Sequence, residues 1–493
     1  MRKKITQMEW KKFHPTSVSM DTDVYYTSLA NKVYKVLGFS HVAAYLNDDS
    51  KIRDLSLRLT AWFEDICSNL GFWRTFNTVC KQRYGKPIPF YDTEDYMEGE
   101  PNLQDVRFLI WDFIQSHNET TFTNPENDGL AMTAMAVFMI FDDQYETAPE
   151  TDELNEIMTS PAFEDDYGFF REMCEWFVKN SYLSLRCQLM NKRDMEVNPD
   201  DYGHITKEQY DYLKEIDLTF LNCNNILAMP SYQWLSQVSG SRIDVDISLF
   251  MPRAYRLDRV LEETCEFIDV QNGNAVSVQR DSFNPFFNKI ISGKTSELFF
   301  LGLIKYNNRY YQIGLMLSDE EKKFDTFLEQ QREKDMRKEL AEQAHKLFVE
   351  KMGSRRFFYC KVGEIREKFY KNLLNQYIND DSEASLIDYL DCGLDVPVAI
   401  CSSPTRGLGF LKYIPQFICD PDNPFYDKET ACNKAHEILF LVDYIEYEHI
   451  CYLLDHNMLP DAKLNSILGD EHGRKLLHDN AQYIVDYVYG CHR

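Results

Sequence analysis

The sequence lacks the short motifs by which many catalytic sites can be recognised. Its thirteen cysteines include no Cys-x-x-Cys pair, no Gly-x-Ser-x-Gly elbow occurs, and His436-Glu437 is not followed by the second histidine of a zinc protease. Gly293-Lys294-Thr295 ends like a phosphate-binding loop, but Asn288 stands where the earlier glycine belongs. The sequence therefore favours a protein that is not an enzyme and holds no cofactor.

Basic residues are scarce, and long apolar runs are absent. Lys and Arg number 53 against 79 Asp and Glu, so the formal charge is −26, which repels nucleic-acid backbones and argues against DNA as a partner. The uncharged, mainly apolar run at residues 129–141 is too short to cross a bilayer, so no membrane contact is predicted. Single cysteines in apolar surroundings, such as Cys67 and Cys360, are typical of reduced thiols and predict a cytoplasmic protein.

The stretch from Cys265 to Leu317 changes from helical to strand-like periodicity. Two apolar runs flank Asn272-Gly273, and a second pair flanks Asn307-Asn308. Asn and Gly tolerate the positive φ angles that tight hairpin turns require, so both pairs are predicted to be hairpins. Four strands of this length indicate a small antiparallel barrel or sheet. The predicted strands are residues 267–270, 275–278, 298–304 and 309–315.

Helical periodicity dominates on both sides of this β module. The predicted fold class is α+β, mainly α, with two helical blocks flanking a small antiparallel β barrel or sheet. A long helix is expected to begin at a capping box of Ser318 and Glu321 and to end at Gly353. Residues 357–360 are predicted to be a short strand that returns to the β module, and residues 396–425 a loop within further helices. The predicted domains are residues 1–228, 229–318 and 319–493.

The second hairpin is the best place for contact with RNA. Lys305, Arg309, Tyr310 and Tyr311, with Lys294 nearby, combine cations that meet phosphates with rings that stack on bases. Aromatic residues on small sheets are also typical of cross-strand packing, and Tyr and Arg are equally residues of protein interfaces. The pattern leaves these alternatives open.

A turn around Arg406 is a candidate site for a small anionic ligand. Gly407 and Gly409 could bring backbone amides close to an anion beside the guanidinium group. The third glycine of a dinucleotide fingerprint is missing, so a loop that needs glycine's backbone freedom is the simpler interpretation. Asp427 could meet Arg406, either as a structural clamp or as part of a site.

Three residues near the C-terminus have a spacing that a metal ion can use. Asp443, Glu446 and His449 are three apart, so they could lie on one face of a helix. A di-iron bundle needs matching Glu-x-x-His pairs from two helices, and the sequence has one. A polar helix face is favoured, and no metal is predicted.

Several stretches are distinctive enough to suggest a family. They are Trp73-Arg74-Thr75-Phe76, Ile88-Pro89-Phe90-Tyr91-Asp92, the segment from Asn102 to Leu109, and Asn423-Pro424-Phe425-Tyr426-Asp427. Together they resemble a bacterial family of unknown function found in gut anaerobes. The resemblance covers most of the chain and carries no catalytic motif, so it implies a bacterial cytoplasmic protein without implying an activity.

The sequence favours a cytoplasmic regulatory or adaptor protein that acts through protein–protein contacts. One alternative is an RNA- or ribosome-associated factor that binds through the β module. Another is a hydrolase or transferase whose site collects Arg406, Asp427 and a histidine from the C-terminal segment, because sites formed from distant residues leave no local motif.

Overall fold

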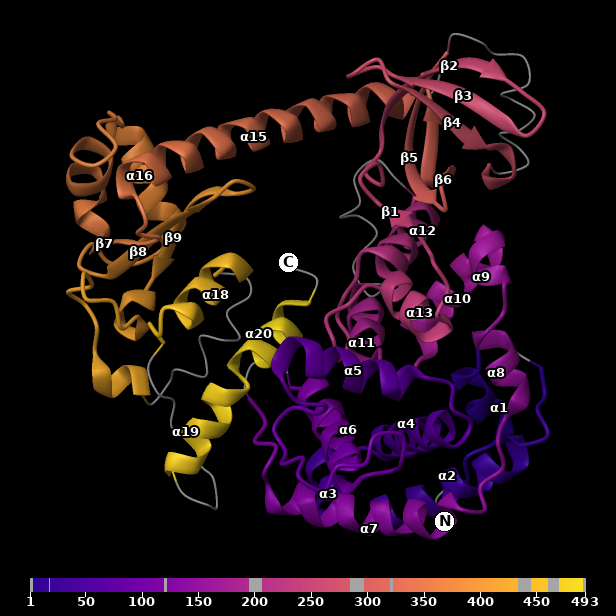
Figure 1. Cartoon of the computed structure of the whole chain (residues 1–493). Helices are drawn as coiled ribbons and strands as arrows, with labels where there is room; N and C mark the ends of the chain where they lie inside the picture. The colour runs from indigo at the N-terminus through magenta and orange to yellow at the C-terminus, as the bar shows by residue number, and fades with distance from the viewer. Residues whose placement is uncertain are drawn as a thin grey trace. The chain divides into compact units, whose positions relative to one another are not determined.

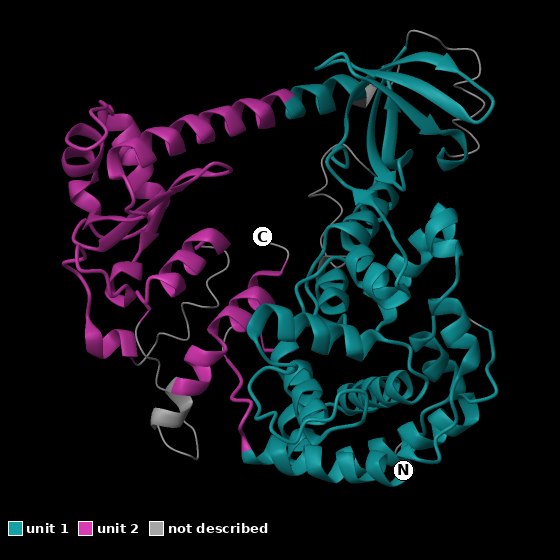
Figure 2. Ribbon diagram, viewed as in Figure 1, with its two compact units in different colours: residues 1–116, 128–331 teal, residues 117–127, 332–493 magenta. Residues whose placement is uncertain are grey.

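The computed structural model describes residues 3–16, 18–118, 122–194, 206–283, 297–319, 322–432, 445–459 and 470–490. It is 55% helical with 13% strand, which confirms the mainly helical α+β class. The chain forms two compact units, residues 1–116 with 128–331 (unit 1) and residues 117–127 with 332–493 (unit 2), shown in Figure 2. The division into three domains at residues 228 and 318 stays a prediction.

Unit 1 begins with a block of helices around the buried helix α4 (Figure 1). Leu55, Leu59, Trp62 and Phe63 of α4 are buried, as the helical spacing of its apolar residues predicts. The helices of this block are α1 (Gln7–Trp10), α2 (Asp23–Leu37), α3 (His41–Leu46), α4 (Asp49–Cys67), α5 (Phe72–Tyr84), α6 (Leu103–Ser116), α7 (Asp128–Tyr145), α8 (Asp152–Met158), α9 (Ala162–Asp165), α10 (Tyr167–Asn180), α11 (Leu185–Asp194), α12 (Lys207–Phe220) and α13 (Ser231–Ser239).

A closed barrel of five strands completes unit 1. Its strands are β2 (Arg253–Val260), β3 (Thr264–Asp269), β4 (Ala275–Gln279), β5 (Leu298–Tyr306) and β6 (Arg309–Ser318), and the short β1 (Val245–Asp246) pairs with β5 outside the ring. All pairs in the ring are antiparallel except β4 with β6. Strand direction cannot alternate all the way round a ring with an odd number of strands. One neighbouring pair in a closed five-stranded barrel must therefore be parallel.

Both predicted hairpins of the barrel are confirmed. Gly273 has φ 74° in the β3–β4 turn, and alternate residues of β3, such as Cys265 and Phe267, point into the core. Strand β2 was not predicted, although its buried Tyr255 and Leu257 alternate with the exposed Arg256 and Asp258, as in a half-buried strand. The predicted candidate Gly293-Lys294-Thr295 lies outside the described residues.

A long helix, α15 (Lys322–Met352), follows the barrel. Its end is predicted correctly, since Gly353 follows with φ 64°. Ser318 is the last residue of β6, and its predicted capping partner Glu321 lies outside the described residues. The first turns of α15 pack on the barrel, where Phe324 contacts the buried Phe300 and Leu317.

Unit 2 contains a three-stranded sheet that the sequence did not predict. Its strands are β7 (Phe358–Lys361), β8 (Pro397–Ser403) and β9 (Gly407–Lys412), in the order β7-β8-β9. A strand is present here at Phe358–Lys361, one residue later than predicted, but the prediction that it returns to the β module is wrong, because β7 pairs with β8. The predicted loop 396–425 is also wrong, since it holds β8 and β9, which pair as an antiparallel hairpin.

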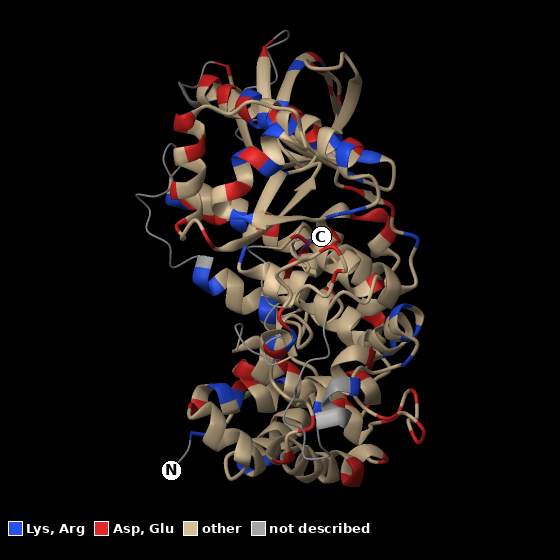
Figure 3. Ribbon diagram, turned by 90° about the vertical axis from the view of Figure 1, so that its left-hand side faces the viewer, with Lys and Arg blue, Asp and Glu red and all other residues tan. Residues whose placement is uncertain are grey.

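The other elements in the described part of unit 2 are helices. Phe348 and Met352 of α15 pack with Val398 and Ile400 of β8 in the core of unit 2. The helices are α16 (Asp380–Leu390), α18 (Tyr447–Asp455), α19 (Asp470–Asp479) and α20 (Ala481–Tyr489), with a π-helix at Ile365–Lys371. Asp and Glu are spread through both units with Lys and Arg between them (Figure 3). Every helix in the described ranges is too short or too polar to cross a bilayer.

Candidate functional site

The tip of the β5–β6 hairpin contains the residues predicted to contact RNA. The turn Asn307-Asn308 has φ angles of 45° and 65°, as its sequence predicts. Arg309 is exposed beside the turn, and Tyr310 is half-buried against the barrel core. Lys305 is also half-buried, and its ammonium group lies 4.0 Å from the Asp244 carboxylate. The exposed cation of this hairpin is therefore Arg309.

The other tyrosines of the hairpin contact the helices of unit 1. Tyr311 is buried, and its ring stacks on Tyr167 of α10 with 4.1 Å between the ring centroids. Tyr306 stacks on Phe170 of α10 with a centroid distance of 4.8 Å, and its hydroxyl donates to the Phe163 carbonyl of α9. These two rings pack the barrel against the helices. Tyr306 and Tyr311 therefore have the packing role that the sequence left open as an alternative to RNA contact. Contact with RNA stays a prediction.

The turn between β8 and β9 holds Arg406, Gly407 and Gly409. The Arg406 side chain is exposed, and its Nε lies 3.7 Å from Oε1 of Glu446. Gly407 has φ 76°, and a Cβ there would lie 3.3 Å from the Cα of Ala341 on α15. A Cβ at Gly409 would lie 3.1 Å from the sulfur of the facing cysteine on β8. Both glycines are therefore required by close packing.

The Asp427 carboxylate makes its hydrogen bonds within its own segment and not with Arg406. Its carboxylate accepts from the backbone amides of Glu429 and Thr430 and from the Thr430 hydroxyl. The hydrogen bonds from Thr430 lower the pKa of this carboxyl group. Asp427 thus starts the next helical turn, and the acid that the structure brings to Arg406 is Glu446.

Two of the three predicted metal-ligand candidates lie beside the Arg406 turn. Oε1 of Glu446 accepts a hydrogen bond from the Ser403 hydroxyl at 2.9 Å. His449 is buried on α18, and burial lowers the pKa of its imidazole although Glu446 acts in the opposite direction. Asp443 lies outside the described residues. No three potential ligands among the described residues are arranged to hold a metal ion.

Sequence reasoning missed a histidine–serine contact at the same place. Nδ1 of His345 on α15 lies 2.9 Å from Oγ of Ser402, which is buried near the end of β8. A single histidine on a highly charged helix gives no signal in the sequence, because the contact depends on how α15 packs on the sheet. We call the following set the Arg406 cluster: His345, Ser402, Ser403, Arg406, Glu446 and His449.

Two buried carboxylates in unit 1 cap helices. Asp65 accepts hydrogen bonds from the backbone amides of residues 71–73 at the start of α5 and from the Tyr182 hydroxyl. Asp105, at the start of α6, accepts from the Tyr96 hydroxyl at 2.7 Å. Burial raises the pKa of Asp65 to about 6 and that of Asp105 to about 7. Their contacts assign both groups a structural role.

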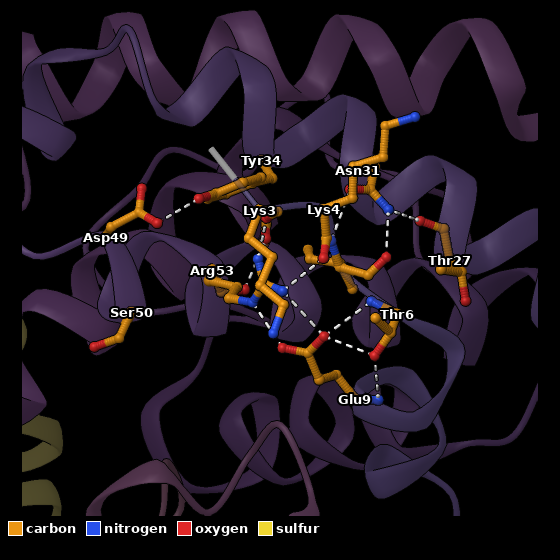
Figure 4. Close-up of polar contacts among 12 residues, drawn as sticks. Lys3, Lys4, Thr6, Glu9, Thr27, Asn31, Tyr34, Asp49, Ser50 and Arg53 are labelled. Atoms are coloured by element: carbon orange, nitrogen blue, oxygen red, sulfur yellow. Dashed lines mark hydrogen bonds and ion pairs between the residues drawn. The ribbon is translucent and has the colours of Figure 1, made fainter. Parts of the chain in front are cut away.

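A polar network fixes the N-terminal segment to α2 and α4 (Figure 4). Arg53 of α4 donates hydrogen bonds to the backbone carbonyls of residues 3 and 4, and its Nε lies 2.7 Å from Oε1 of Glu9. The hydrogen bonds from Arg53 are the main reason why the pKa of Glu9 is lowered to about 2. Asn31 of α2 exchanges two hydrogen bonds with the backbone of Ile5. This network is a clamp within unit 1.

A surface pocket of about 220 Å³ lies beside the π-helix of unit 2. Arg366, Lys371 and Tyr377 are among its lining residues. The Arg366 guanidinium is 2.6 Å from an oxygen of Asp380 and 2.9 Å from an oxygen of Glu383. The arginine of this pocket is therefore already paired with carboxylates of the same unit.

Helix α7 has apolar side chains on both of its faces. The inner face is buried in unit 1, where Phe141 stacks on Phe63 of α4 with 4.7 Å between the ring centroids. The outer side chains of Met132, Met135 and Met139 are 62%, 45% and 65% exposed. Their spacing of three and four residues places them on one side of the helix. We call these three residues the methionine face.

Two aromatic side chains extend the exposed apolar surface near α7. Helix α3, which packs against α7, carries Tyr45 with 62% exposure, and Phe39 just before α3 is 86% exposed. Figure 1 shows α3 and α7 next to each other at the edge of unit 1. The sequence alone singled out residues 129–141 as an uncharged run, but it gave no indication that half of this helix faces solvent.

The acidic residues that follow the methionine face have no basic neighbours in the sequence. Asp142 and Asp143 are exposed in the last turn of α7, which contains no basic residue. No Lys or Arg occurs between Arg107 and Arg171. Because the C-terminus of a helix carries partial negative charge, these two carboxylates destabilise the helix that bears them.

The fold defines a mainly helical α+β protein with a closed five-stranded barrel. The chain belongs to the family described as "Protein of unknown function (DUF3843)", which matches residues 4–256 and 306–489. No curated protein and no solved structure matches the chain. The matched residues include α7 and the whole Arg406 cluster, and they leave out β3 and β4.

Proposed function

We propose that this protein is a cytoplasmic regulatory or adaptor factor that acts through protein–protein contacts, with the methionine face as its binding surface. The observation that carries the proposal is the exposure of Met132, Met135 and Met139 on a helix that is apolar all round. Such a helix is normally buried, so an exposed row of methionines on it is typical of a surface that another protein covers.

The chemistry of methionine supports this role. Its side chain is unbranched and polarisable, and it adapts to partners of different shape, which is why methionine is frequent on surfaces that bind several targets. The cytoplasmic location is supported by the described cysteines, all of which have free thiols.

The Arg406 cluster supports the alternative of a hydrolase or transferase. Ser402 and His345 are at hydrogen-bonding distance, and Arg406 adds a cation on the same hairpin. This alternative has less support than the adaptor role, because the side chains of Ser402 and Ser403 are buried and engaged with their neighbours.

An RNA-associated role is supported mainly by Arg309 and Tyr310. It requires bases to stack on a hairpin whose other two rings are buried against α10. An absorbance ratio at 260 and 280 nm that shows bound RNA in the purified protein, lost on substitution of Arg309 and Tyr310 by Ala, would favour this alternative over the adaptor role.

The adaptor role is tested by purification of tagged protein from the cells that make it, followed by mass spectrometry. We expect a protein partner at fixed stoichiometry that is lost from the triple variant Met132→Gln, Met135→Gln, Met139→Gln. The matched control is Met97→Gln, Met251→Gln, Met336→Gln, since these methionines are 55%, 62% and 57% exposed, close to the exposure of the methionine face. Equal retention in both variants, or no protein partner at all, would overturn the proposal.

A further inference from the structure

The methionine face is long enough to bind one helix, and two aspartates follow it at one end. Met132 and Met139 are two helical turns apart, about 10 Å along α7, and Asp142 and Asp143 follow within the next turn. The methionines and the two aspartates therefore form one row along α7, with an apolar part and a charged end. A partner that covers all of it must present apolar side chains to the methionines and a complementary group to the carboxylates.

The charge at the end of the row is uniformly negative. Asp142 and Asp143 add to the partial negative charge of the helix C-terminus, and Glu146 and Glu150 follow as exposed acids. With no Lys or Arg between Arg107 and Arg171, no cation from this part of the sequence is available to neutralise them. Opposite charge within a Debye length favours association, so the complementary group is a cation.

A second copy of this chain does not satisfy these requirements. Two α7 helices packed antiparallel would bring Asp142 and Asp143 towards Asp128 of the other copy, and a parallel arrangement would bring like acids together. Like charges that face each other across an interface are unfavourable. The chain as a whole carries a formal charge of −26, which adds to the repulsion between copies.

We propose that the methionine face binds a basic amphipathic helix of a partner protein, whose apolar residues cover Met132, Met135 and Met139 and whose Lys or Arg side chains pair with Asp142 and Asp143. An amphipathic helix that lays its apolar side on an exposed methionine-rich surface is an established mode of recognition. This inference rests on the proposed adaptor role and names the chemistry of its partner.

The charged end gives the proposal a second, independent consequence. If Asp142 and Asp143 are kept to bind a partner, they are unfavourable for α7 itself. The double variant Asp142→Asn, Asp143→Asn should therefore bind more weakly and yet unfold at an equal or higher temperature than the wild type. A merely structural role of these carboxylates predicts a lower unfolding temperature.

The direct test is titration of the full chain with a synthetic helix of Leu and Lys in amphipathic order, followed by fluorescence anisotropy. We expect saturable binding that weakens at least tenfold in the variant Met132→Gln, Met135→Gln, Met139→Gln and remains unchanged in Met97→Gln, Met251→Gln, Met336→Gln. In Asp142→Asn, Asp143→Asn, binding should weaken several-fold. It should also depend less on salt between 50 and 200 mM, a range over which the Debye length falls by about half.

Three comparison outcomes would overturn the inference. One is equal binding of a helix of Leu and Glu, which would indicate a nonspecific apolar surface. Another is equal binding of a scrambled Leu and Lys peptide, which would indicate attraction to net charge alone. The third is a dimer of the wild-type chain in sedimentation that the methionine-face variant abolishes. If none of the peptides binds but a cellular partner is still lost from that variant, the inference fails while the adaptor role stands.

Discussion

The ring of Tyr311 lies on the ring of Tyr167, with 4.1 Å between the centroids and 21° between the planes. The two residues belong to β6 of the barrel and α10 of the helical block, so the stack joins the two parts of unit 1. Offset stacking of this kind adds to the free energy gained from burial of the rings. The hairpin tip is therefore a structural joint, whatever else Arg309 beside it contacts.

Loss of the Tyr311 ring should loosen this joint. Tyr311→Ala removes a buried aromatic side chain, which is expected to lower the free energy of unfolding by about 3 kcal/mol or more. Tyr377→Ala is the control, because Tyr377 is 83% exposed and its loss should cost less than about 0.5 kcal/mol. Hydrogen–deuterium exchange of the β5 and β6 amides measures the effect, and equal protection in the two variants would contradict it.

Gly407 should not tolerate a side chain. Gly407→Ala forces alanine into φ 76° and places its Cβ 3.3 Å from Ala341. Gly353→Ala is the matched control, since its φ is 64° but no atom lies within 4 Å of the added Cβ. We expect the control to lower the free energy of unfolding by about 1 kcal/mol and Gly407→Ala by at least about 2 kcal/mol. Equal thermal midpoints would show that the contact with α15 is unimportant.

Local turn chemistry explains which parts of the fold could be predicted from the sequence. Asn272-Gly273 and Asn307-Asn308 identify their hairpins because the positive φ angles depend on those residues alone. The β8–β9 hairpin has Pro404 at its turn and two glycines in β9, which are depleted in strands, so its sequence looks like a loop. Its strands form because β7 supplies the missing pairing partner, and such a partner cannot be found from local sequence.

The candidate sites were predictable only in part. Arg406, Glu446 and His449 were each singled out by residue type and spacing, but for two unrelated sites that the structure brings together. The exposure of Met132 and Met139 was not predictable, because an apolar run gives no indication of which side other helices cover.

The two buried aspartates of unit 1 should make its stability depend on pH in an unusual direction. The pKa values of Asp65 and Asp105, about 6 and about 7, lie above the ordinary value of 3.8. The folded state therefore keeps protons that the unfolded state has released, and their contribution to the free energy of unfolding falls as pH rises from about 4 to 7. Urea unfolding across this range should show a smaller fall in the double variant Asp65→Asn, Asp105→Asn. Asp48→Asn, at an exposed helix cap, should keep the wild-type slope.

Unit 2 should respond to acid in the opposite way through His449. Burial lowers the pKa of this imidazole below 6.5, against the influence of Glu446 and Glu448, so the unfolded state binds a proton that the folded state excludes. The free energy of unfolding should fall as pH falls below about 6.5, and His449→Phe should reduce this fall. His456→Gln, at the exposed position directly after the same helix, serves as the control. Exchange of the β8 amides at pH 5 and pH 7.5 reports the difference, and identical protection at both would refute the prediction.

Unit 2 is assembled from two separate stretches, because residues 117–127 belong to it while α6 and α7 on either side belong to unit 1. A gene shortened after residue 331 would therefore encode unit 1 together with a segment that has lost the rest of its own unit. Neither unit can be expressed alone by a single cut. Genetic dissection of this protein has to rely on substitutions in the intact chain, such as those in the methionine face and the Arg406 cluster.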